Sequence, residues 1–439
     1  MIPLTETFSE GYLSDVQKNQ IVEGSIAVER ISFIKTIVMG DGERYATLVD
    51  QNGLPLFYPT LYLTTQRRNA SLAYSTLVNE AASISVLLQC FHERGIDIHR
   101  RIAEGDLLKL HEIDALRDRC QQKMLGLPTA VGKSAVSLFS GNVYVTQEAE
   151  YARLTTIKRY LKFLCLRVLP NRSTPEIAKE FESMLEAIAA RRPRKKGRNQ
   201  SSVELKSPEI DVDHVFETIR PGSSFNPWAG HQNQIRNRLV FLLLYELGIR
   251  RGELLNLRCD DFDLSSNRVA IIRRADDIDD PRAEQPLVKT NERLLPVHDS
   301  LAKEVTNYIT TVRNKTPNAR RHPYLFVTHK LGPTVGSPLT IAGYKKVMDT
   351  LRQSTPELAD FTGHKFRHHW NLRFSELMDS LDNPPSEAVQ DQMRSNAMGW
   401  RQGSGTAAIY NKRFIERKAH EAGMNLQEGQ IKLPRELLF

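Results

Sequence analysis

A short basic stretch, "RRPRKKGRN" (191–199), divides this chain and limits how it can fold. It holds six basic residues and no acidic one, with a proline and a glycine among them, and the polar run "QSSVELKSPE" follows. Proline and glycine interrupt regular helix. At 439 residues the chain is also too long for one ordinary core. We therefore predict an exposed basic linker at 191–205 between two folded halves.

The periodicity of apolar residues differs on the two sides of this linker. Residues 1–64 contain short strand-like runs, with Asn52-Gly53 as a hairpin signal, and are expected to form an N-terminal extension. Apolar residues at helical spacing predict a helical domain over 65–190, including a helix that stops at Gly95 and another that stops at Pro170. Four cations decorate the polar side of that second helix, either as a solvated face or as a DNA contact: Arg153, Lys158, Arg159 and Lys162.

The second half, 206–422, has mixed periodicity. A buried helix over about 234–247 precedes strand-like "NRVAIIRR" (267–274) and the segment "QPLVKTNERLLPV" (285–297), in which we expect two strands around a turn at Lys289. Helices follow at about 340–352, 363–380, 386–398 and from 406. The expected fold class is mainly α with a small antiparallel β-sheet, and residues 423–439 form a tail that is a candidate contact with a neighbouring protomer.

The net charge and the cysteines limit which partners and which cellular compartment are expected. A formal charge of +8 and a sequence pI near 9.2 suit a polyanion such as nucleic acid, or an anionic membrane surface. The longest apolar run, "LVFLLLY" (239–245), is too short to span a bilayer, and no secretory signal is expected at the N-terminus. The four cysteines form no C-x-x-C pair, which favours reduced thiols in the cytoplasm.

Three segments imitate ligand sites. "GLPTAVGKS" (126–134) places five residues between its glycines where a phosphate-binding P-loop needs four. The acidic run 275–284 lacks the glycine of a calcium loop and has no closing glutamate at the right spacing, so a solvated acidic loop is the simpler interpretation. His364 and His368 are four residues apart, but Lys365 stands where a zinc protease needs glutamate. We predict neither a metal nor a nucleotide cofactor.

Four short segments together indicate chemistry on a phosphodiester. "LGIRRGELLNL" (247–257) carries Arg250 with Glu253 three residues later, where a carboxylate can orient an arginine. Lys289 lies at the expected turn, and "HKFRH" places His364 and Arg367 on one helix face. "AMGWRQGSGTAAIYNKRF" (397–414) supplies the last two candidates, Trp400 and Tyr410. The set contains hydrogen-bond donors for a phosphate and one nucleophile, and each member alone is more simply structural.

The order and local sequence of these segments resemble the tyrosine recombinase (phage integrase) family. The family's G-x-R-x-x-E-L pattern matches Gly248, Arg250, Glu253 and Leu254, and its hairpin lysine before an R-x-x-P strand matches Lys289, Arg293 and Pro296. Its H-x-x-R box matches His364 and Arg367, with His368 as the following histidine. Trp400 stands where a histidine is commoner, and Tyr410 matches the nucleophile.

The resemblance implies a core-binding domain at 65–190 and a catalytic domain at 206–422. It implies a site-specific recombinase or integrase of a mobile genetic element that acts through a 3′-phosphotyrosyl intermediate without ATP or metal. The implied partners are double-stranded DNA and further copies of the chain, as a tetramer on paired sites in the nucleoid-associated cytoplasm. The linker would then add DNA contacts through Arg194, Lys195 and Lys196.

Two alternatives share these residues. A type IB topoisomerase-like or telomere resolvase-like enzyme would use the same active-site chemistry and give different DNA products. A catalytically silent DNA-binding regulator could use the same fold, although the complete set of site residues argues against it.

Overall fold

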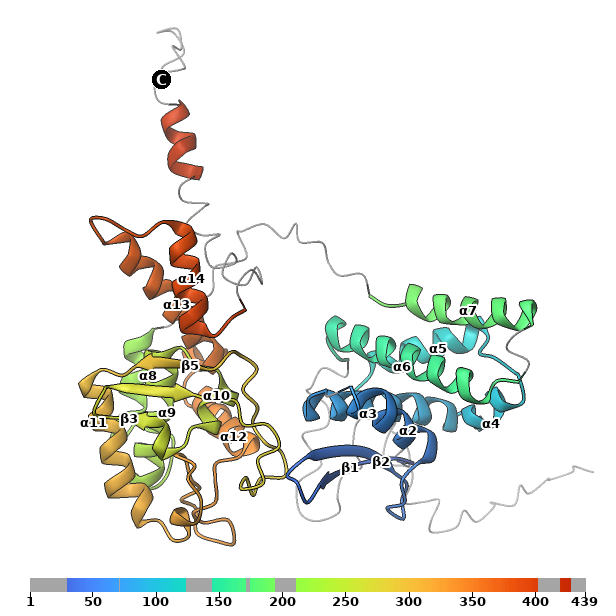
Figure 1. Cartoon of the computed structure of the whole chain (residues 1–439), viewed down its shortest axis with the longest axis horizontal. Coiled ribbons are helices and arrows are strands. Elements are labelled where there is room, and N and C mark those ends of the chain that lie inside the picture. The colour runs from blue at the N-terminus through green and yellow to red at the C-terminus, as the bar shows by residue number, and fades with distance from the viewer. Residues whose placement is uncertain are drawn as a thin grey trace, which may run out of the picture. The chain divides into compact units, whose positions relative to one another are not determined.

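The computed structural model describes residues 30–70, 72–123, 144–170, 174–193, 211–401 and 419–427 (Figure 1). Its contacts divide the chain into two compact units. The first comprises Met1–Ile37 and Tyr45–Asn199, and the second comprises Val38–Arg44 and Gln200–Phe439. The described residues are mainly helical, with one two-stranded and one three-stranded sheet, which is the predicted fold class. Tyr410, the three predicted DNA contacts at 194–196 and most of the tail 423–439 lie outside the described residues.

A hairpin opens the described chain. Strand β1 (Phe33–Val38) pairs with β2 (Arg44–Val49), and the turn between them is closed by a 2.8 Å hydrogen bond from Met39 N to Glu43 O. The hairpin predicted at Asn52-Gly53 forms as a short one. Asp50 N donates to Leu54 O and Leu56 N donates to Leu48 O, each at 2.9 Å, on either side of an isolated bridge between Val49 and Pro55. Pro55 has no N–H to extend a ladder, and helix α2 (Phe57–Tyr62) begins two residues later.

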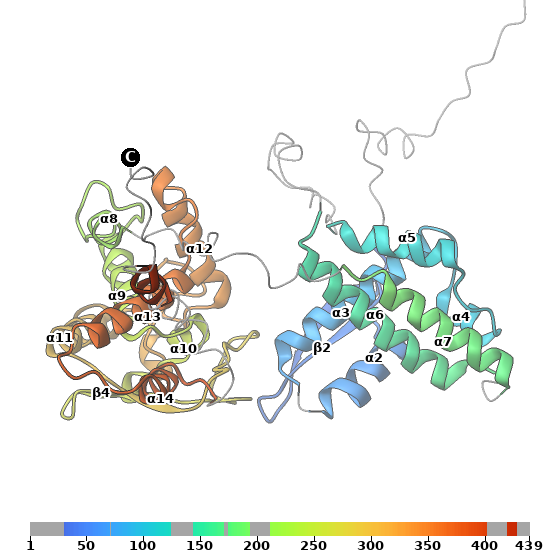
Figure 2. The same ribbon diagram turned by 90° about the horizontal axis from the view of Figure 1, so that it is seen from above.

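The first unit is a helical bundle built around α6 (Gln147–Val168), as Figures 1 and 2 show. Helix α6 packs on α2, α3, α4, α5 and α7 and buries its apolar face among them. The predicted helix ends are confirmed: α6 stops two residues before Pro170, and α3 ends just before Gly95, whose φ is +67°. The remaining elements are α2, the π-helical turn η1 (Leu63–Arg68), α3 (Tyr74–His92), α4 (Ile98–Ala103), α5 (Leu110–Gln121) and α7 (Pro175–Ala190).

The second unit surrounds a small sheet with helices (Figure 1). Strands β3 (Phe262–Asp263), β4 (Arg268–Ile271) and β5 (Arg293–Pro296) run antiparallel in that order, and Ile271 faces Arg293 across β4 and β5. The labelled α-helices are α8 (Val212–Thr218), α9 (His231–Leu247), α10 (Arg251–Asn256), α11 (Asp299–Asn307), α12 (Ile341–Arg352), α13 (Gly363–Asp379) and α14 (Glu387–Met398), and residues 419–427 are also helical. Short turns complete the unit: η4 (Cys259–Asp261), η5 (Tyr308–Val312), η6 (Arg313–Lys315), η7 (Ala319–Arg321) and η8 (Pro356–Leu358).

An aromatic cluster fixes the start of α13 in this unit. Phe366 is fully buried, and its ring packs edge-on against Phe241, Tyr245 and Phe361 at centroid distances of 6.2, 5.4 and 5.0 Å. These partners come from α9 and from the segment just before α13. Phe366 lies between His364 and Arg367, so its packing sets the rotation of the helix face that carries both.

All four cysteines are free thiols, and Cys90, Cys120 and Cys165 are buried. Burial raises the pKa of the Cys120 and Cys165 thiols to about 12, so these thiols are inert packing groups. Among the described residues, no helix is long and apolar enough to cross a membrane.

Replacing Phe366 by alanine tests how strongly the aromatic cluster supports the site. The change should lower the free energy of unfolding by about 3–5 kcal/mol, because it leaves a cavity in a closely packed core. Leu377→Ala on the same helix, where the side chain is 56% exposed, should change it by less than about 0.5 kcal/mol. Chemical denaturation of both variants measures this, and equal losses would contradict the packing role.

Candidate active site

Arg250 stands at a tight turn between two helices. Gly248 ends α9 in the left-handed conformation with φ +59°, and a side chain there would meet Trp370 at 2.9 Å. Arg250 is the N-cap of α10, and its backbone N–H donates to Glu253 Oε2 at 3.0 Å. Its side chain is 32% exposed, with Nη1 3.7 Å from Glu253 Oε1. The turn therefore holds a half-buried guanidinium on a fixed backbone.

Glu253 is the buried acceptor behind this turn. Its carboxylate, 1% exposed, receives Arg293 Nη2 at 2.9 Å and the Thr290 hydroxyl at 2.5 Å. Burial alone would raise the pKa of Glu253, but the charge and hydrogen bonds of Arg293, with those of Thr290 and Arg250, outweigh it and hold the pKa below its usual value. Glu253 is thus an anion that joins the Arg250 turn to the segment beside Lys289.

Arg367 is the most deeply buried cation of the predicted set. It is 1% exposed, and it donates through Nη1 to the carbonyl of Gly248 and through Nη2 to that of Met398, each at 2.8 Å. Its guanidinium carbon also lies 5.3 Å from the centroid of the Trp400 ring. One side chain on α13 therefore ties the turn that carries Arg250 to the end of α14 and to Trp400.

Trp400 is placed by a second left-handed glycine. Gly399 caps α14 with φ +64°, and its carbonyl accepts from Asn291 N at 3.0 Å. A side chain at 399 would meet Arg293 Nη1 at 2.6 Å, so the closest approach of the two segments requires glycine. Trp400 itself is buried, at 6% exposure.

Lys289 is exposed and lies in the long connection between β4 and β5, four residues before β5 begins. The predicted turn between two strands is wrong on its first side. Residues 285–288 form no strand, and only β5 follows the lysine as expected. The acidic stretch explains the difference, because it leads the chain away from β4 before it returns to the sheet.

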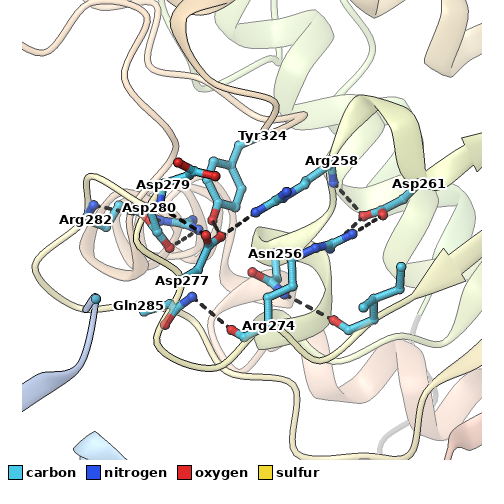
Figure 3. Close-up of polar contacts among 12 residues, drawn as sticks. Asn256, Arg258, Asp261, Arg274, Asp277, Asp279, Asp280, Arg282, Gln285 and Tyr324 are labelled. Atoms are coloured by element: carbon cyan, nitrogen blue, oxygen red, sulfur yellow. Dashed lines mark hydrogen bonds and ion pairs between the residues drawn. The ribbon is translucent and has the colours of Figure 1, made fainter. Parts of the chain in front are cut away.

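The acidic stretch is held down by arginines (Figure 3). Asp280 receives two 2.8 Å hydrogen bonds from Arg282, and Asp277 receives Arg258 and the Tyr324 hydroxyl, the latter at 2.6 Å. Asp280 and Arg282 are 4% and 5% exposed. The interpretation of a solvated acidic loop is therefore wrong for Asp277 and Asp280, because ion pairs with arginines hold both carboxylates. The described residues contain no group of three or more His, Cys, Asp or Glu arranged for a metal ion.

His364 lies beside both arginines on the first turn of α13. Its ring packs edge-on against His368, with centroids 4.6 Å apart. The surrounding protein, then the charges of His368, Arg367 and Arg250, lower the pKa of His364 to about 4. Partial burial, then Arg367, also lowers the pKa of His368. Both imidazoles are therefore neutral at neutral pH, so each can accept a proton.

The structure brings five of the six predicted catalytic residues into one connected group. Arg250, His364, Arg367 and Trp400 are linked by the contacts above, and Lys289 is joined to them through its neighbour Thr290. The linking residues Thr290 and Asn291 were not predicted, and Arg293 was singled out only as a motif match. The sequence did contain a signal for the role of Arg293. Strand alternation places Arg293 on the buried face of β5 together with Leu295, and a buried arginine needs a carboxylate partner.

The predicted DNA contacts on α6 differ from one another. Arg153 donates through Nη1 to the carbonyls of Cys120 at 2.8 Å and Gln122 at 2.7 Å, so it caps the end of α5 and is withdrawn as a DNA contact. Lys162 and Arg159 are exposed, and Lys158 is half-buried. Arg159 Nη1 lies 3.9 Å from Glu80 Oε1, so the two charges interact only weakly.

Residues 224–415 match the model of the phage integrase family. The matched range contains the six residues predicted to be catalytic. This part of the chain is therefore similar to the phage integrase family, which the motifs of the sequence also resemble.

Curated relatives match about a third of the chain. Tyrosine recombinase XerC of Staphylococcus carnosus (strain TM300) is 26% identical over 163 residues, which cover 36% of this chain and 44% of that protein. Tyrosine recombinase XerC of Staphylococcus aureus (strain COL) is 24% identical over 160 residues, with the same coverage. The chain thus spans less than half the length of these relatives.

The solved structures that the chain matches include the Tn1549 transposon integrase in complex with circular intermediate DNA. It is 14% identical, with a TM-score of 0.45, and the match covers 80% of this chain and 94% of that one. The XerA recombinase is 15% identical with a TM-score of 0.31, over 82% of this chain and 98% of that one.

The lowered pKa of His364 predicts how it titrates in the free protein. Because the neutral form is favoured, the ring should stay unprotonated as the pH falls through the ordinary histidine value of about 6.5 and should titrate only well below it. Proton NMR of the histidine ring signals, assigned with His364→Gln, measures this. A His364 midpoint at or above about 6.5 would show that the neighbouring cations do not act on the ring.

Proposed function

We propose that this chain is a site-specific DNA recombinase or integrase that breaks and rejoins DNA strands through a 3′-phosphotyrosyl intermediate. The proposal rests on the two hydrogen bonds from Arg367 to the carbonyls of Gly248 and Met398. These bonds bring Arg250, His364 and Trp400 together from three segments. Three cationic or N–H donors beside a neutral imidazole suit an anionic phosphodiester. The family match of this half of the chain supports the same conclusion.

Arg250 and Arg367 would hold the scissile phosphate. Arginine suits this task because its planar fork donates two parallel hydrogen bonds and stays charged. Nη1 of Arg250 is screened from water and has no hydrogen-bond acceptor among the described residues. A phosphate oxygen would supply that acceptor. These bonds strengthen as negative charge builds on the pentacoordinate phosphorus, so they favour the transition state over the ground state.

Tyr410 would be the nucleophile. Its oxygen forms a bond to phosphorus, its phenolic proton passes to a base, and the bond from phosphorus to the 5′-oxygen breaks. Neutral His364 can take the proton, and the adjacent phosphate anion would raise the pKa of His364 toward neutrality and so strengthen it as a base. Lys289 would protonate the departing 5′-oxygen. The opposite assignment of His364 and Lys289 obeys the same proton balance.

The covalent link conserves the energy of the broken bond. A second 5′-hydroxyl can therefore attack the phosphotyrosine and release Tyr410, so strand exchange needs no ATP, and the donors above neutralise the phosphate without requiring a metal. Trp400 would donate its indole N–H toward a phosphate oxygen or support Arg367 from behind. Trp400 cannot relay a proton, because indole has a donor and no basic site.

Double-stranded DNA is the proposed partner, bound in part through its phosphates. Lys158, Arg159 and Lys162 on α6 and the basic linker with Arg194, Lys195 and Lys196 would contribute, and the net charge of +8 favours such binding. Paired recombination sites would hold four copies of the chain in the nucleoid. Strand-exchange products, as opposed to relaxed or hairpin DNA, separate this proposal from topoisomerase-like and resolvase-like activity.

Replacing Tyr410 by phenylalanine tests the nucleophile. The variant should bind DNA as the wild type does and form no covalent complex, because phenylalanine has no oxygen to attack phosphorus. The measurement uses a nicked suicide duplex that carries the cleavage site mapped in DNA flanking the gene, followed by denaturing electrophoresis. A covalent adduct formed by Tyr410→Phe would refute the assignment.

Replacing Arg250 by alanine tests the phosphate grip, with Arg251→Ala, an exposed neighbour, as the matched control. Cleavage by the Arg250 variant should slow by roughly 10²–10³-fold, about 2.7–4 kcal/mol, as for a lost oxyanion donor. Single-turnover cleavage at saturating protein measures the rate. Near-normal cleavage by Arg250→Ala, or an equal loss in Arg251→Ala, would contradict the proposed contact.

A further inference from the structure

We propose that Arg293 is a positioning residue that fixes Lys289 for proton delivery to the leaving 5′-oxygen. The inference rests on the proposed function, because it gives Arg293 a task only if Lys289 acts as the general acid. Arg293 touches neither DNA nor the reacting atoms in this account. It acts through Thr290 and Asn291, the two residues that follow the lysine.

Arg293 binds the segment beside Lys289 at several points. Its Nη1 donates to the hydroxyl of Thr290 at 3.1 Å and to the carbonyl of Asn291 at 3.4 Å. Thr290 in turn donates to Glu253 at 2.5 Å, and Asn291 N donates to the carbonyl of Gly399 at 3.0 Å. The two residues directly after Lys289 are therefore held by side-chain and backbone hydrogen bonds, although Lys289 itself is exposed.

The other contacts of Arg293 anchor it to fixed parts of the site. Nη2 pairs with Glu253 at 2.9 Å, behind the Arg250 turn, and Nε donates to the carbonyl of Ala397 at 2.7 Å, at the end of α14. Arg293 is 8% exposed, and the ion pair is buried from both sides. One guanidinium thus joins the lysine segment to Arg250 on one side and to the Trp400 segment on the other.

Only an arginine makes this set of bonds. Its three nitrogens point in three fixed directions, whereas the single nitrogen of lysine can satisfy Glu253 but cannot also reach Ala397 and Thr290. The left-handed Gly399 leaves room for the fork, since a side chain there would meet Nη1 at 2.6 Å. The Lys289 ammonium sits on a flexible four-carbon stem, so its reach toward one oxygen depends on a rigid backbone beneath it.

A substrate whose leaving group needs no proton distinguishes a variant in which Lys289 is misplaced from a variant that has lost structure in general. When sulfur replaces the bridging 5′-oxygen at the scissile phosphate, the departing group is a thiolate, and a thiol ionises at a pKa of about 8.5. A defect in general-acid catalysis is then relieved, whereas a defect in phosphate binding or in the nucleophile persists.

The test measures single-turnover cleavage of matched oxygen and sulfur suicide duplexes. Arg293→Lys, which keeps the charge beside Glu253, should cleave the oxygen duplex about 10–100-fold more slowly than wild type, as part of the 10²–10⁴-fold that a general acid contributes. The sulfur duplex should restore its rate to within about threefold of wild type. Lys289→Ala should show the same restoration, and Arg250→Ala should not.

Arg282→Lys is the matched structural control. Arg282 is a buried, ion-paired arginine in the same β4–β5 connection, and its bonds go to Asp280, Leu255 and Leu339. If Arg282→Lys slows cleavage at all, it should slow cleavage of both duplexes equally. Arg293→Met, with thermal unfolding measured alongside, shows how much of any loss comes from an uncompensated Glu253.

Three outcomes would overturn the inference: normal cleavage of the oxygen duplex by Arg293→Lys, an equal defect on both duplexes, or a sulfur-reversible defect in Arg282→Lys as well. Failure of the wild type to form an adduct on either duplex would instead refute the proposed function. Cleavage by the wild type together with any of the three outcomes refutes the role of Arg293 alone.

Discussion

The buried ion pair between Glu253 and Arg293 is the interaction on which the geometry of the site depends. Two charges removed from water are tolerated only when each is paired and hydrogen-bonded, and loss of one partner typically costs about 3–5 kcal/mol. Here the pair receives Thr290 and the Arg250 backbone on the carboxylate and gives a bond to Ala397 from the guanidinium. The pair thereby fixes segments that are far apart in the sequence relative to one another. It does so without using their functional side chains.

Arg367 complements that pair from the other side of the site. It donates to two backbone carbonyls that end helices, Gly248 after α9 and Met398 in α14, and both helices need a left-handed glycine to make the turn. The helix ends have unpaired carbonyls, and a buried cation satisfies them well. The same guanidinium lies beside Trp400, so the protein uses one residue both to assemble the site and, in the proposed function, to bind phosphate.

Much of this could be predicted from the sequence, since the information is local. Helix ends at Gly95 and Pro170, the left-handed Gly248 and the pairing of His364 with Arg367 on one face follow from spacing and backbone chemistry alone. The misses were non-local. The acidic stretch binds Arg258 and Tyr324 from other segments through Asp277, and Arg153 binds backbone carbonyls at the end of another helix. Arg293 is the instructive case, because strand alternation places it inside but only the folded chain shows which carboxylate and which carbonyl it meets.

The central claim is that DNA cleavage passes through a covalent bond between Tyr410 and a 3′-phosphate. The most direct measurement is tandem mass spectrometry of the covalent complex trapped on a suicide duplex, after digestion with protease and nuclease. The account predicts one modified peptide, with a nucleotide attached through its 3′-phosphate to Tyr410 and a free 5′-hydroxyl on the released strand. A nucleotide on another residue, a 5′-phosphate linkage, or the absence of any adduct while DNA is cut would contradict it.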